Sequence, residues 1–585
     1  MRHTKIICTI GPASESVEVL SRMVESGMNI SRHNFSHGSR EEHRRRINNV
    51  RTAAARTGRT VGIMVDLRGP KIRIGDLEPE PVELKAGDEL TLTTEVIKGN
   101  RRRISVDYQP LPREVGPGNT ILLGDGLVGL EVLRVEGSEV LCRVLNDALL
   151  TSRKGVNLPG VRTSIPTVTE KDIRDLHFAL ELGFDFVAAS FVRRAEDILS
   201  VRAILEKFES EAHIVAKIET WEAVENLDDI IKVTDAVMVA RGDLGLEIAA
   251  EEVPLVQKKI IARCNLAGKP VITATQMLES MIHNPRPTRA EASDVANAIL
   301  DGTDAVMLSA ETATGEYPVA AVETMDRIAR RAEADLPYGM LLHQRHRDIS
   351  RRTVTDAISY ATCATAADLD AAAIITATQT GYTARMVAKY RPARPIVAVT
   401  PREDVVRRLT LLWGVQPVYV QEEIEDTDRM ISASIEAALA AGLIRGGDLV
   451  VITAGVPVGL HGSTNLLKVH TVGNVLARGI GIGNQAVTGS LKIAHSAAEA
   501  LVKIEPGDIL VTRATDRDYV PAIEKSSGVI TEVGGLTSHA AVVCLQFNLP
   551  VIVGVTGATE ILDEGAIVTI DALRGLVYSG ATRVL

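Results

Sequence analysis

Two short apolar runs end in charged residues that a buried strand would not carry without a reason. The first spans 214–218, contains Lys217 and is followed by Glu219; the second spans 238–240 and is followed by Gly242 and Asp243. Carboxylate oxygens together with substrate phosphates are the ligands that Mg²⁺ prefers. The lysine adds a positive charge, and the glycine lets a ligand approach the backbone. We expect a divalent-cation and phosphate site here, and the competing interpretation is a pair of buried salt bridges.

Polar residues recur at the same place in successive β/α units. Strand-like runs alternate with helical patterns, three before residue 69 and five after residue 170. Such alternation predicts a parallel sheet with right-handed crossovers, and eight units match a (β/α)₈ TIM barrel. The polar residues after these strands should meet at the C-terminal rim, where barrel enzymes keep their sites; they include Arg32, Asn34, Asp66, Ser190, Lys217, Glu219, Arg241, Asp243, Thr275 and Gln276.

The remaining chain divides into three further parts. Residues 69–166 carry Gly and Pro turns between short alternating runs, which predicts an all-β domain inserted into the barrel, itself 1–68 and 167–340. Residues 351–472 return to β/α alternation, and we expect an α/β domain there. A glycine-rich joint at 473–489 then opens a last domain at 473–585.

Two stretches outside the barrel could also bind or carry phosphate. In the α/β region, hydroxyl residues and a glycine precede a helix at Thr378, Thr380, Gly381 and Thr383, which is typical of an anion pocket and equally of simple helix capping. In the last domain, His539 follows a Gly-Gly turn and opens a small-residue helix. This histidine is either a phosphate-carrying nucleophile or a capping residue in a structural module.

Composition excludes several classes of protein. The 585 residues carry a net charge of −10 and 3% aromatic residues, with no basic block, which argues against nucleic acid as a main partner. No apolar run is long enough to cross a membrane, and the N-terminus enters a strand pattern without a signal peptide. The five cysteines are scattered without a CxxC pair, as expected in a reducing compartment. We therefore expect a cytoplasmic protein.

At this point the motifs resemble those of the pyruvate kinase family. The matching stretches are TIGP (9–12), NFSHG (34–38), GPKIR (69–73), KGVNLPG (154–160), AKIE (216–219), MVARGDLG (238–245) and TATQML (273–278). Together with a looser likeness in the α/β region, the resemblance extends from the start to about residue 472. It implies a barrel interrupted by a β-domain and followed by an α/β effector domain. The implied reaction is phosphoryl transfer from phosphoenolpyruvate to ADP, giving pyruvate and ATP.

The resemblance also implies a role for each matching residue. Mg²⁺ or Mn²⁺ would be held by Glu219 and Asp243, and Lys217 would neutralise charge on the moving phosphoryl group and the enolate. Thr275, through a water, would relay the proton to the enolate carbon. The binding roles are: Arg32 for the substrate phosphate; Gly242, Asp243 and Thr275 for the substrate carboxylate; and Asn34, His37, Arg73 and Lys154 for the nucleotide, with Arg73 also catalytic.

One position departs from many members of the family. The monovalent site that they use for potassium corresponds to Asn34, Ser36, Asp66 and Leu67, where Leu67 replaces a common threonine. Lys71 stands where potassium-requiring members have glutamate. Because an ammonium can supply the missing cation's charge, we predict catalysis without potassium. The resemblance further implies a phosphorylated effector bound at residues 378–383, and a homotetramer.

The last domain resembles the phosphohistidine domain of phosphoenolpyruvate-utilising enzymes such as pyruvate phosphate dikinase. His539 matches the histidine that carries phosphate there, but those enzymes pair it with an ATP-grasp domain that the sequence does not contain. Two alternatives to a pyruvate kinase remain. One is a dikinase-like phosphotransferase acting through His539, and the other is a catalytically inactive sensor of phosphometabolites, which the intact charged residues of the barrel argue against.

Overall fold

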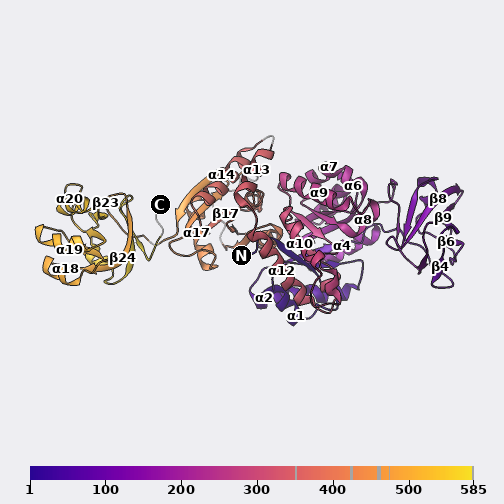
Figure 1. Ribbon diagram of the computed structural model, residues 1–585, viewed down its shortest axis with the longest axis horizontal. Coiled ribbons are helices and arrows are strands. Elements are labelled where there is room, and N and C mark those ends of the chain that lie inside the picture. Colours follow the sequence, from indigo (N-terminus) through magenta and orange to yellow (C-terminus); the bar gives the residue numbers. More distant parts are fainter. Residues whose placement is uncertain (350–351, 422–425, 458–462, 474, 583–585) are drawn as a thin grey trace. The chain divides into compact units, whose positions relative to one another are not determined.

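The computed structural model describes residues 1–349, 352–421, 426–457, 463–473 and 475–582. The chain forms two compact units (Figure 1). The first consists of Met1–Ser350 and Arg402–Pro417, and the second of Arg351–Pro401 and Val418–Leu585. In the described ranges no helix is both long and apolar enough to span a bilayer.

The first unit is built on a closed barrel of eight parallel strands, which confirms the predicted (β/α)₈ fold. Around the barrel the order is β1-β16-β15-β14-β13-β12-β3-β2, so neighbours in sequence are neighbours in space. The strands are β1 (Lys5–Thr9), β2 (Ile30–Asn34), β3 (Gly62–Asp66), β12 (Phe186–Val192), β13 (His213–Ile218), β14 (Ala236–Ala240), β15 (Val271–Ala274) and β16 (Ala305–Leu308).

Helices surround this barrel, and several begin by the same local pattern. Ser39, Thr169 and Thr288 each cap a helix, with an acidic residue three positions later that bonds back to the cap. These capping boxes satisfy amides that the first helical turn leaves free, so the helices start where the sequence places the pattern. The main covering helices are α1 (Val17–Glu25), α2 (Arg40–Thr57), α4 (Glu170–Leu182), α5 (Ala195–Lys207), α7 (Leu227–Val233), α9 (Val253–Ala267), α10 (Arg289–Leu300) and α12 (Pro318–Ala334).

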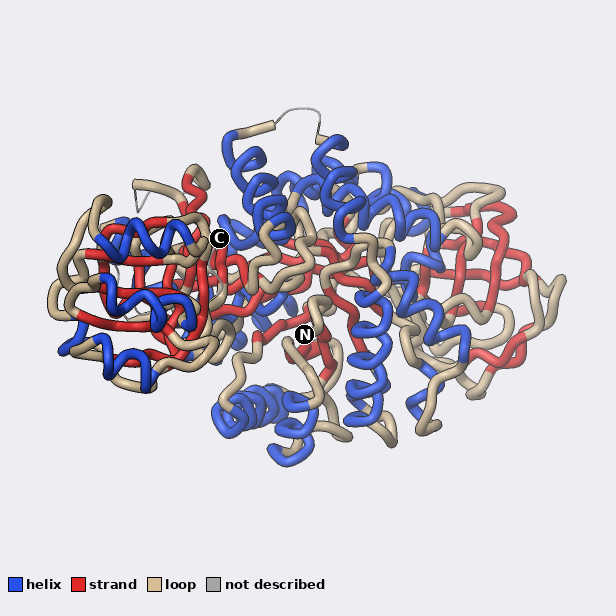
Figure 2. Tube along the Cα trace, turned by 60° about the vertical axis from the view of Figure 1, so that its left-hand side comes forward, coloured by secondary structure: helices blue, strands red, loops and turns tan. Residues whose placement is uncertain are grey.

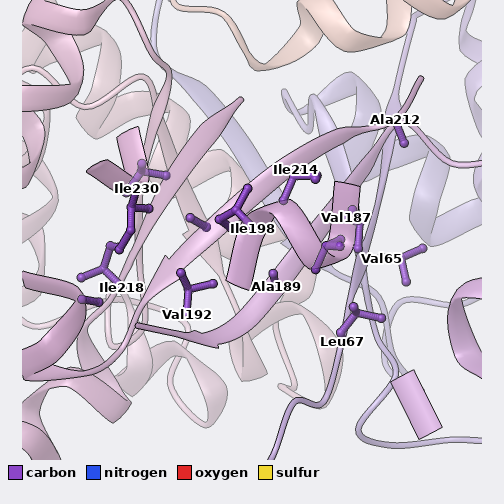
Figure 3. Packing of buried hydrophobic residues seen from close by; sticks show 14 of the residues in the cluster. Val65, Leu67, Val187, Ala189, Val192, Ile198, Ala212, Ile214, Ile218 and Ile230 are labelled. Atoms are coloured by element: carbon purple, nitrogen blue, oxygen red, sulfur yellow. The ribbon is translucent and has the colours of Figure 1, made fainter. Parts of the chain in front are cut away.

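Each barrel strand has an outer and an inner face, because successive side chains of a strand alternate. The outer residues pack under the helices. Figure 3 shows Val187 and Ala189 of β12 with Ile214 and Ile218 of β13, near the helix residue Ile198. The inner residues fill the barrel itself and are also apolar: they include Ile7, Ile30, Met64, Phe186, Ala188, Val215, Met238, Ile272 and Met307.

The same alternation decides which residues reach the C-terminal rim from inside. Two positions after an inner apolar residue, the chain places Arg32 on β2, Asp66 on β3, Ser190 on β12 and Lys217 on β13. The apolar filling of the barrel therefore ends in a layer of polar and charged side chains, as the sequence predicts.

A segment from outside the barrel sequence contributes to its core. Helix α16 (Glu403–Arg408) and the 3-10 turn η2 (Leu409–Leu411) belong to the first unit, although the sequence places them in the α/β region. Leu411 is buried among the inner residues of the barrel, and Arg407 Nε donates to the buried carboxylate of Asp185 at 2.8 Å. No periodicity in the sequence shows this long-range packing.

The inserted domain is all-β apart from one short helix. A six-stranded sheet has the order β11-β7-β8-β9-β5-β6, beside the two-stranded sheet β10-β4. The predicted all-β domain is confirmed, and its short helix α3 (Leu111–Glu114) begins after Pro110. Several of these strands are labelled in Figure 1; the set is β4 (Val82–Leu84), β5 (Glu89–Thr93), β6 (Arg103–Ser105), β7 (Thr120–Leu123), β8 (Val128–Glu136), β9 (Glu139–Val144), β10 (Ala148–Leu150) and β11 (Val156–Asn157).

Two further sheets follow the barrel along the chain, and their strands appear in red in Figure 2. The α/β sheet has the order β19-β18-β17-β20-β21, with β17 (Ala373–Ala377), β18 (Ile396–Thr400), β19 (Val415–Tyr419), β20 (Leu449–Ala454) and β21 (Leu466–Thr471). The last part of the chain forms an eight-stranded sheet of order β22-β29-β28-β24-β25-β26-β27-β23. Its helices α18 (Ala497–Lys503), α19 (Val520–Lys525) and α20 (His539–Gln546) pack on the central strands.

Replacing Leu411 by alanine tests the role of the segment from residue 402 to 417. Because Leu411 is fully surrounded by the barrel core, Leu411→Ala should destabilise the first unit by about 2–5 kcal/mol. Calorimetric unfolding of the full chain measures this as a lower Tm of the corresponding transition. Leu199→Ala is the matched control, since Leu199 is 50% exposed on α5. Equal effects of the two substitutions would contradict a core role for Leu411.

Candidate active site

The charged layer at the rim of the barrel is one connected network. Arg32 Nε donates to Asp66 Oδ2 at 2.6 Å, and Lys217 Nζ lies 3.4 Å from Asp66 Oδ1 and 2.7 Å from Glu219 Oε1. Lys217 also donates to Ser190 Oγ at 2.7 Å. Two cations and two anions thus neutralise one another in a site that is almost closed to solvent. The structure therefore brings five of the predicted rim residues into direct contact.

Lys217 is held in its charged form by this network. Burial alone would disfavour the ammonium, but the charges of Asp66 and Glu219 outweigh it and raise the pKa of Lys217 above its ordinary value. The pKa of Asp66 is lowered, because Arg32 and Lys217 outweigh the effect of burial. A permanent cation at the rim can neutralise an anion that is transferred there.

Glu219 is the least satisfied member of the network. Its Oε2 accepts a hydrogen bond from Phe191 N at 2.7 Å, whereas Oε1 contacts Lys217 without the geometry of a hydrogen bond. Burial raises the pKa of Glu219, and the charge of Asp243 raises it further against the opposing effect of Lys217. A buried carboxylate that is repelled by a second carboxylate is suited to a divalent cation.

The donor set around Glu219 fits such a cation only in part. Throughout the described part of the chain, no group of three or more His, Cys, Asp or Glu is arranged to hold a metal ion. Two carboxylates alone leave most positions of an octahedral ion to water and substrate oxygens, which is how Mg²⁺ is usually bound beside phosphates. Glu219 and Asp243 therefore fit a Mg²⁺ shared with a phosphorylated substrate.

A bulge in β12 aims two groups into this site, and sequence reasoning missed it. The pairing of β12 with β13 shifts register between Ala189 and Val192, and Phe191 between them has a φ of 54°. The irregularity turns the Phe191 amide toward Glu219, while Ser190 Oγ donates to the Leu67 carbonyl at 2.8 Å. Bulges of this kind often re-aim side chains at active sites, but no residue type in the sequence signals one here.

A cleft of about 700 Å³ opens beside the charged layer. It is lined by Gly242 and Asp243 after β14, by Gln276 after β15, and by Lys71 and Asp125 of the inserted domain. Lys71 Nζ and Asp125 Oδ1 lie 3.3 Å apart. The volume is that of a site for a nucleotide-sized ligand.

Thr275 packs against Gly242, which lines this cleft, in an unusual conformation. Thr275 and Gln276 both have positive φ values, 75° and 55°. A β-branched residue in this region is strained by on the order of 1–3 kcal/mol. The methyl group of Thr275 lies over Gly242, where a Cβ would come within 2.9 Å of it. Gly242 is therefore required for Thr275 to adopt this position.

The predicted nucleotide residues fall into two groups. Arg73 and Lys154 lie on paired segments of the inserted domain, since Ile74 N donates to the Lys154 carbonyl at 3.0 Å. Asn34 ends β2, and His37 is exposed in the loop that follows it. Each group is brought together locally, and no contact joins the two groups within the described residues.

The residues predicted for a monovalent cation are occupied by other contacts. Asn34 Oδ1 accepts from Ser36 N at 3.0 Å, Asp66 pairs with Arg32, and the Leu67 carbonyl accepts from Ser190. Lys71 lies in the adjoining cleft.

In the α/β region, the predicted effector residues form a tight turn before α15 (Tyr382–Ala388). Thr378 Oγ1 accepts from Gly381 N at 2.9 Å, and Gly381 has a φ of 83°. Thr380 is exposed, whereas Thr383 is buried and its Oγ1 bonds to Thr464 Oγ1 at 3.1 Å. The turn therefore presents Thr380 to solvent.

His539 begins helix α20 in the last domain. Ser538 caps this helix, and the Nδ1 atom of His539 bonds to Thr515 Oγ1 at 3.0 Å. The side chain is half-buried. The hydrogen bond fixes the orientation of the ring, and both a phosphate carrier and a structural cap are compatible with this.

Glu247 is a further residue near the cleft that the sequence did not indicate. It lines a small cavity together with Asn157 of the inserted domain and Trp221 of the barrel. Burial raises its pKa to about 7; a hydrogen bond from Asn157 opposes the shift, and the charge of Asp243 adds to it. A lone glutamate in an amphipathic stretch carries no signal of such burial.

Comparisons with known proteins match three parts of the chain to family models. The model of the pyruvate kinase barrel domain matches residues 1–322, that of the pyruvate kinase alpha/beta domain matches 356–470, and that of the mobile domain of PEP-utilising enzymes matches 504–575. The chain is 54% identical to a pyruvate kinase of Geobacillus stearothermophilus and 46% identical to one of Staphylococcus aureus, each over the full length of both chains. A crystal structure of a pyruvate kinase from Cryptosporidium parvum is similar at 43% identity and a TM-score of 0.77, covering 80% of this chain and 96% of that one.

Glu247 should make the stability of the protein depend on pH. Its pKa is about 7 in the folded state against an ordinary value of 4.5, so the folded protein holds an extra proton between these values. The stability that this residue contributes is present below about pH 4.5 and lost as the pH rises through 7. Glu247→Gln should remove this dependence and be the more stable protein by ~1–3 kcal/mol at pH 8.

Urea unfolding of both proteins between pH 5 and pH 8 measures the difference. Glu251→Gln, at an exposed position nearby, is the control and should follow the unmodified protein. If Glu247→Gln kept the same slope with pH, the raised pKa of Glu247 would be disproved.

Proposed function

The chain belongs to the pyruvate kinase family, so it is a glycolytic kinase with phosphoenolpyruvate and ADP as substrates and pyruvate as product, and we propose that the transfer takes place at the charged rim of its barrel. The observation that carries this proposal is the buried ammonium of Lys217 between Asp66 and Glu219. Phosphoryl transfer needs positioned charge more than covalent chemistry, and this network provides it.

Glu219 and Asp243 are the proposed ligands of Mg²⁺, which Mn²⁺ could replace. When bound, the divalent cation would supply positive charge that neutralises the anionic substrate. The raised pKa of Glu219 and its incompletely bonded Oε1 support the assignment. Asp243 adds the second carboxylate from the first turn after β14.

Arg32 and Lys217 are proposed to act on the phosphoryl group. Arg32 donates through Nε to Asp66 and through Nη1 to Thr9 Oγ1, and these two hydrogen bonds fix the guanidinium. Its other N–H groups remain available to a phosphate. Lys217 stays protonated and would neutralise charge both on the phosphoryl group and on the enolate oxygen left behind. Ser190 and Asp66 hold its ammonium in place.

The substrate carboxylate is proposed to lie against Gly242 and Thr275. The Thr275 methyl lies where a side chain on Gly242 would stand, so only glycine leaves room for Thr275 beside the backbone of residues 242–243. The Thr275 hydroxyl is proposed to orient a water that protonates the enolate carbon, because a lone hydroxyl is too weak an acid at neutral pH. Asn34, His37, Arg73 and Lys154 are proposed to bind the nucleotide phosphates, with Arg73 also contributing to catalysis.

Lys71 is proposed to replace potassium. Its ammonium reaches the cleft from the inserted domain and lies 3.3 Å from Asp125 Oδ1, so it can add positive charge beside the phosphates. The residues Asn34, Ser36, Asp66 and Leu67, which would form the monovalent site, are already engaged with one another and with Arg32 and Ser190.

The first experiment is the formation of pyruvate and ATP from phosphoenolpyruvate, ADP and Mg²⁺ in potassium-free buffer. Both products should form in equal amounts and with little stimulation by K⁺. Lys71→Glu should lower turnover in this buffer by about 10-fold or more, with recovery on adding K⁺, because one charge beside a developing anion is worth a few kcal/mol.

The control for this experiment is Lys98→Glu, which makes the same charge change at an exposed position of the inserted domain. It should behave like the unmodified protein. If the unmodified protein were active only after K⁺ was added, the assigned kinase activity would stand and the proposed role of Lys71 would be disproved. If neither pyruvate nor ATP formed with or without K⁺, the alternative of a catalytically inactive sensor would be favoured.

The turn at Thr378, Thr380, Gly381 and Thr383 is proposed to bind a phosphorylated effector that activates the enzyme. The exposed Thr380 hydroxyl and the left-handed backbone at Gly381 support this proposal, because backbone N–H groups in such turns can bind anions. An allosteric claim requires a measured coupling between the two sites.

Replacing both Thr380 and Thr383 by valine should lower the ratio of activated to basal turnover towards one, because the hydroxyl donors are lost. Turnover at sub-saturating phosphoenolpyruvate, with and without a panel of sugar phosphates and AMP, measures this ratio. Thr427→Val in the same domain is the control. A variant with no basal turnover would instead indicate a structural role for the turn.

The part from residue 473 to 585 is proposed to be a module retained for stability or assembly. The three matched family models account for most of the chain, and the dikinase-like alternative through His539 would require an ATP-grasp domain in addition. We also retain the sequence-based domain limits, a homotetramer and a cytoplasmic location as parts of the proposal. The five buried, unpaired cysteines support a reducing compartment.

A further inference from the structure

The strained conformation of Thr275 and Gln276 needs a partner that holds it. Thr275 and Gln276 both have a positive φ, although neither is a glycine. Threonine is among the residues that adopt this backbone region least readily. Such conformations persist only where the surroundings determine them. The β15 strand ends at Ala274, so strand pairing does not hold the two residues that follow it.

Arg241 donates to the carbonyl groups of this segment in succession. Its Nε lies 3.3 Å from the Ala274 oxygen and 3.1 Å from the Thr275 oxygen. Its Nη2 lies 2.6 Å from the Thr275 oxygen and 3.3 Å from the Gln276 oxygen. One planar guanidinium thus spans three consecutive carbonyl groups on both sides of Thr275.

The other edge of the Arg241 guanidinium is anchored on Asp294 of helix α10 and faces Gln257 of helix α9. Nη1 donates to Asp294 Oδ1 at 2.8 Å and points to Gln257 Oε1 at 3.4 Å. The side chain is only 11% exposed. The ion pair fixes the position from which Arg241 acts on the strained segment.

These contacts leave Arg241 little capacity to bind substrate, although it lines the cleft. An arginine has five N–H donors, and those of Arg241 are directed at backbone carbonyls, Asp294, Gln257 and the Met277 sulfur. An arginine that binds an anion in a bidentate manner needs two N–H donors that point at the anion. The N–H groups of Arg241 are instead directed at protein groups.

We propose that Arg241, anchored by Asp294, is the positioning residue for Thr275: it holds the backbone of residues 274–276 in the strained form that places the Thr275 side chain against Gly242. The inference rests on the proposed role of Thr275 at the substrate carboxylate and the enolate. Lysine could not replace Arg241, since a single ammonium cannot span the carbonyls in one plane.

The first test compares structure and kinetics of Arg241→Lys and Arg241→Ala. Crystal structures of both variants should show Thr275 out of the left-handed region. Turnover should fall by about 10- to 100-fold, as expected for a misplaced catalytic group, with the KM for phosphoenolpyruvate changed by less than about threefold. Arg202→Ala is the control, because Arg202 forms a similar ion pair with Asp235 on the outside of the barrel.

The second test asks whether Arg241 acts through Thr275. In a Thr275→Ala background, adding Arg241→Lys should lower kcat by less than about twofold. If the two residues acted independently, the fold-losses in kcat from the two substitutions would multiply. Methylguanidinium added to Arg241→Ala should restore part of kcat, which a merely structural loss would not allow.

The outcomes separate this inference from the proposed function. An unchanged Thr275 conformation in both variants overturns the inference whatever the activity, and so does a raised KM at unchanged kcat, which would make Arg241 a direct substrate ligand. If the unmodified protein formed no pyruvate, the proposed function would fail. The crystal structures would then decide the role of Arg241 by themselves.

Discussion

The neutral quartet of Arg32, Asp66, Lys217 and Glu219 is the interaction on which the rest of the structure depends. Removing four charges from water is expensive, and mutual attraction compensates for it only when each charge keeps a close partner. The distances of 2.6–3.4 Å meet that condition, with Ser190 completing the bonds of Lys217. Loss of any one member would leave an unpaired buried charge, which typically costs about 3–5 kcal/mol. A barrel built only for stability would have apolar residues in this layer.

Strain is concentrated around the same layer. The left-handed residues Phe191, at the bulge within β12, and Thr275, directly after β15, are each met by a charged side chain at the backbone. Glu219 accepts the amide of Phe191, and Arg241 donates to the carbonyl of Thr275. Glu219 and Arg241 therefore both line the site and hold its backbone. A replacement of similar size without the same hydrogen-bonding groups could not do both.

The inserted domain completes the cleft and is fastened to the barrel at both of its connections. On the entering side, Gly69 N donates to the buried Asp172 at 3.2 Å. On the returning side, Arg193 donates to the carbonyls of Thr163 and Ile165, each at 2.6 Å. These bonds tie the domain that carries Lys71, Arg73 and Lys154 to the strand ends that carry the charged layer. The insertion thus brings extra cations to a site that the barrel alone would leave open on one side.

The sequence by itself determined the eight β/α units, the inserted β-domain and the rim position of Arg32, Asp66, Lys217 and Glu219. Period-two alternation and local capping are short-range properties, and a polar residue two positions after an inner apolar one must reach the rim from inside. Only the tertiary structure decided the packing of Leu411 in the barrel, the bulge at Phe191, the burial of Glu247 and the contact of Arg241 with Thr275. Each of these features depends either on a contact between segments that are distant in the chain or on a backbone dihedral angle. The type of a single residue encodes neither a long-range contact nor a dihedral angle.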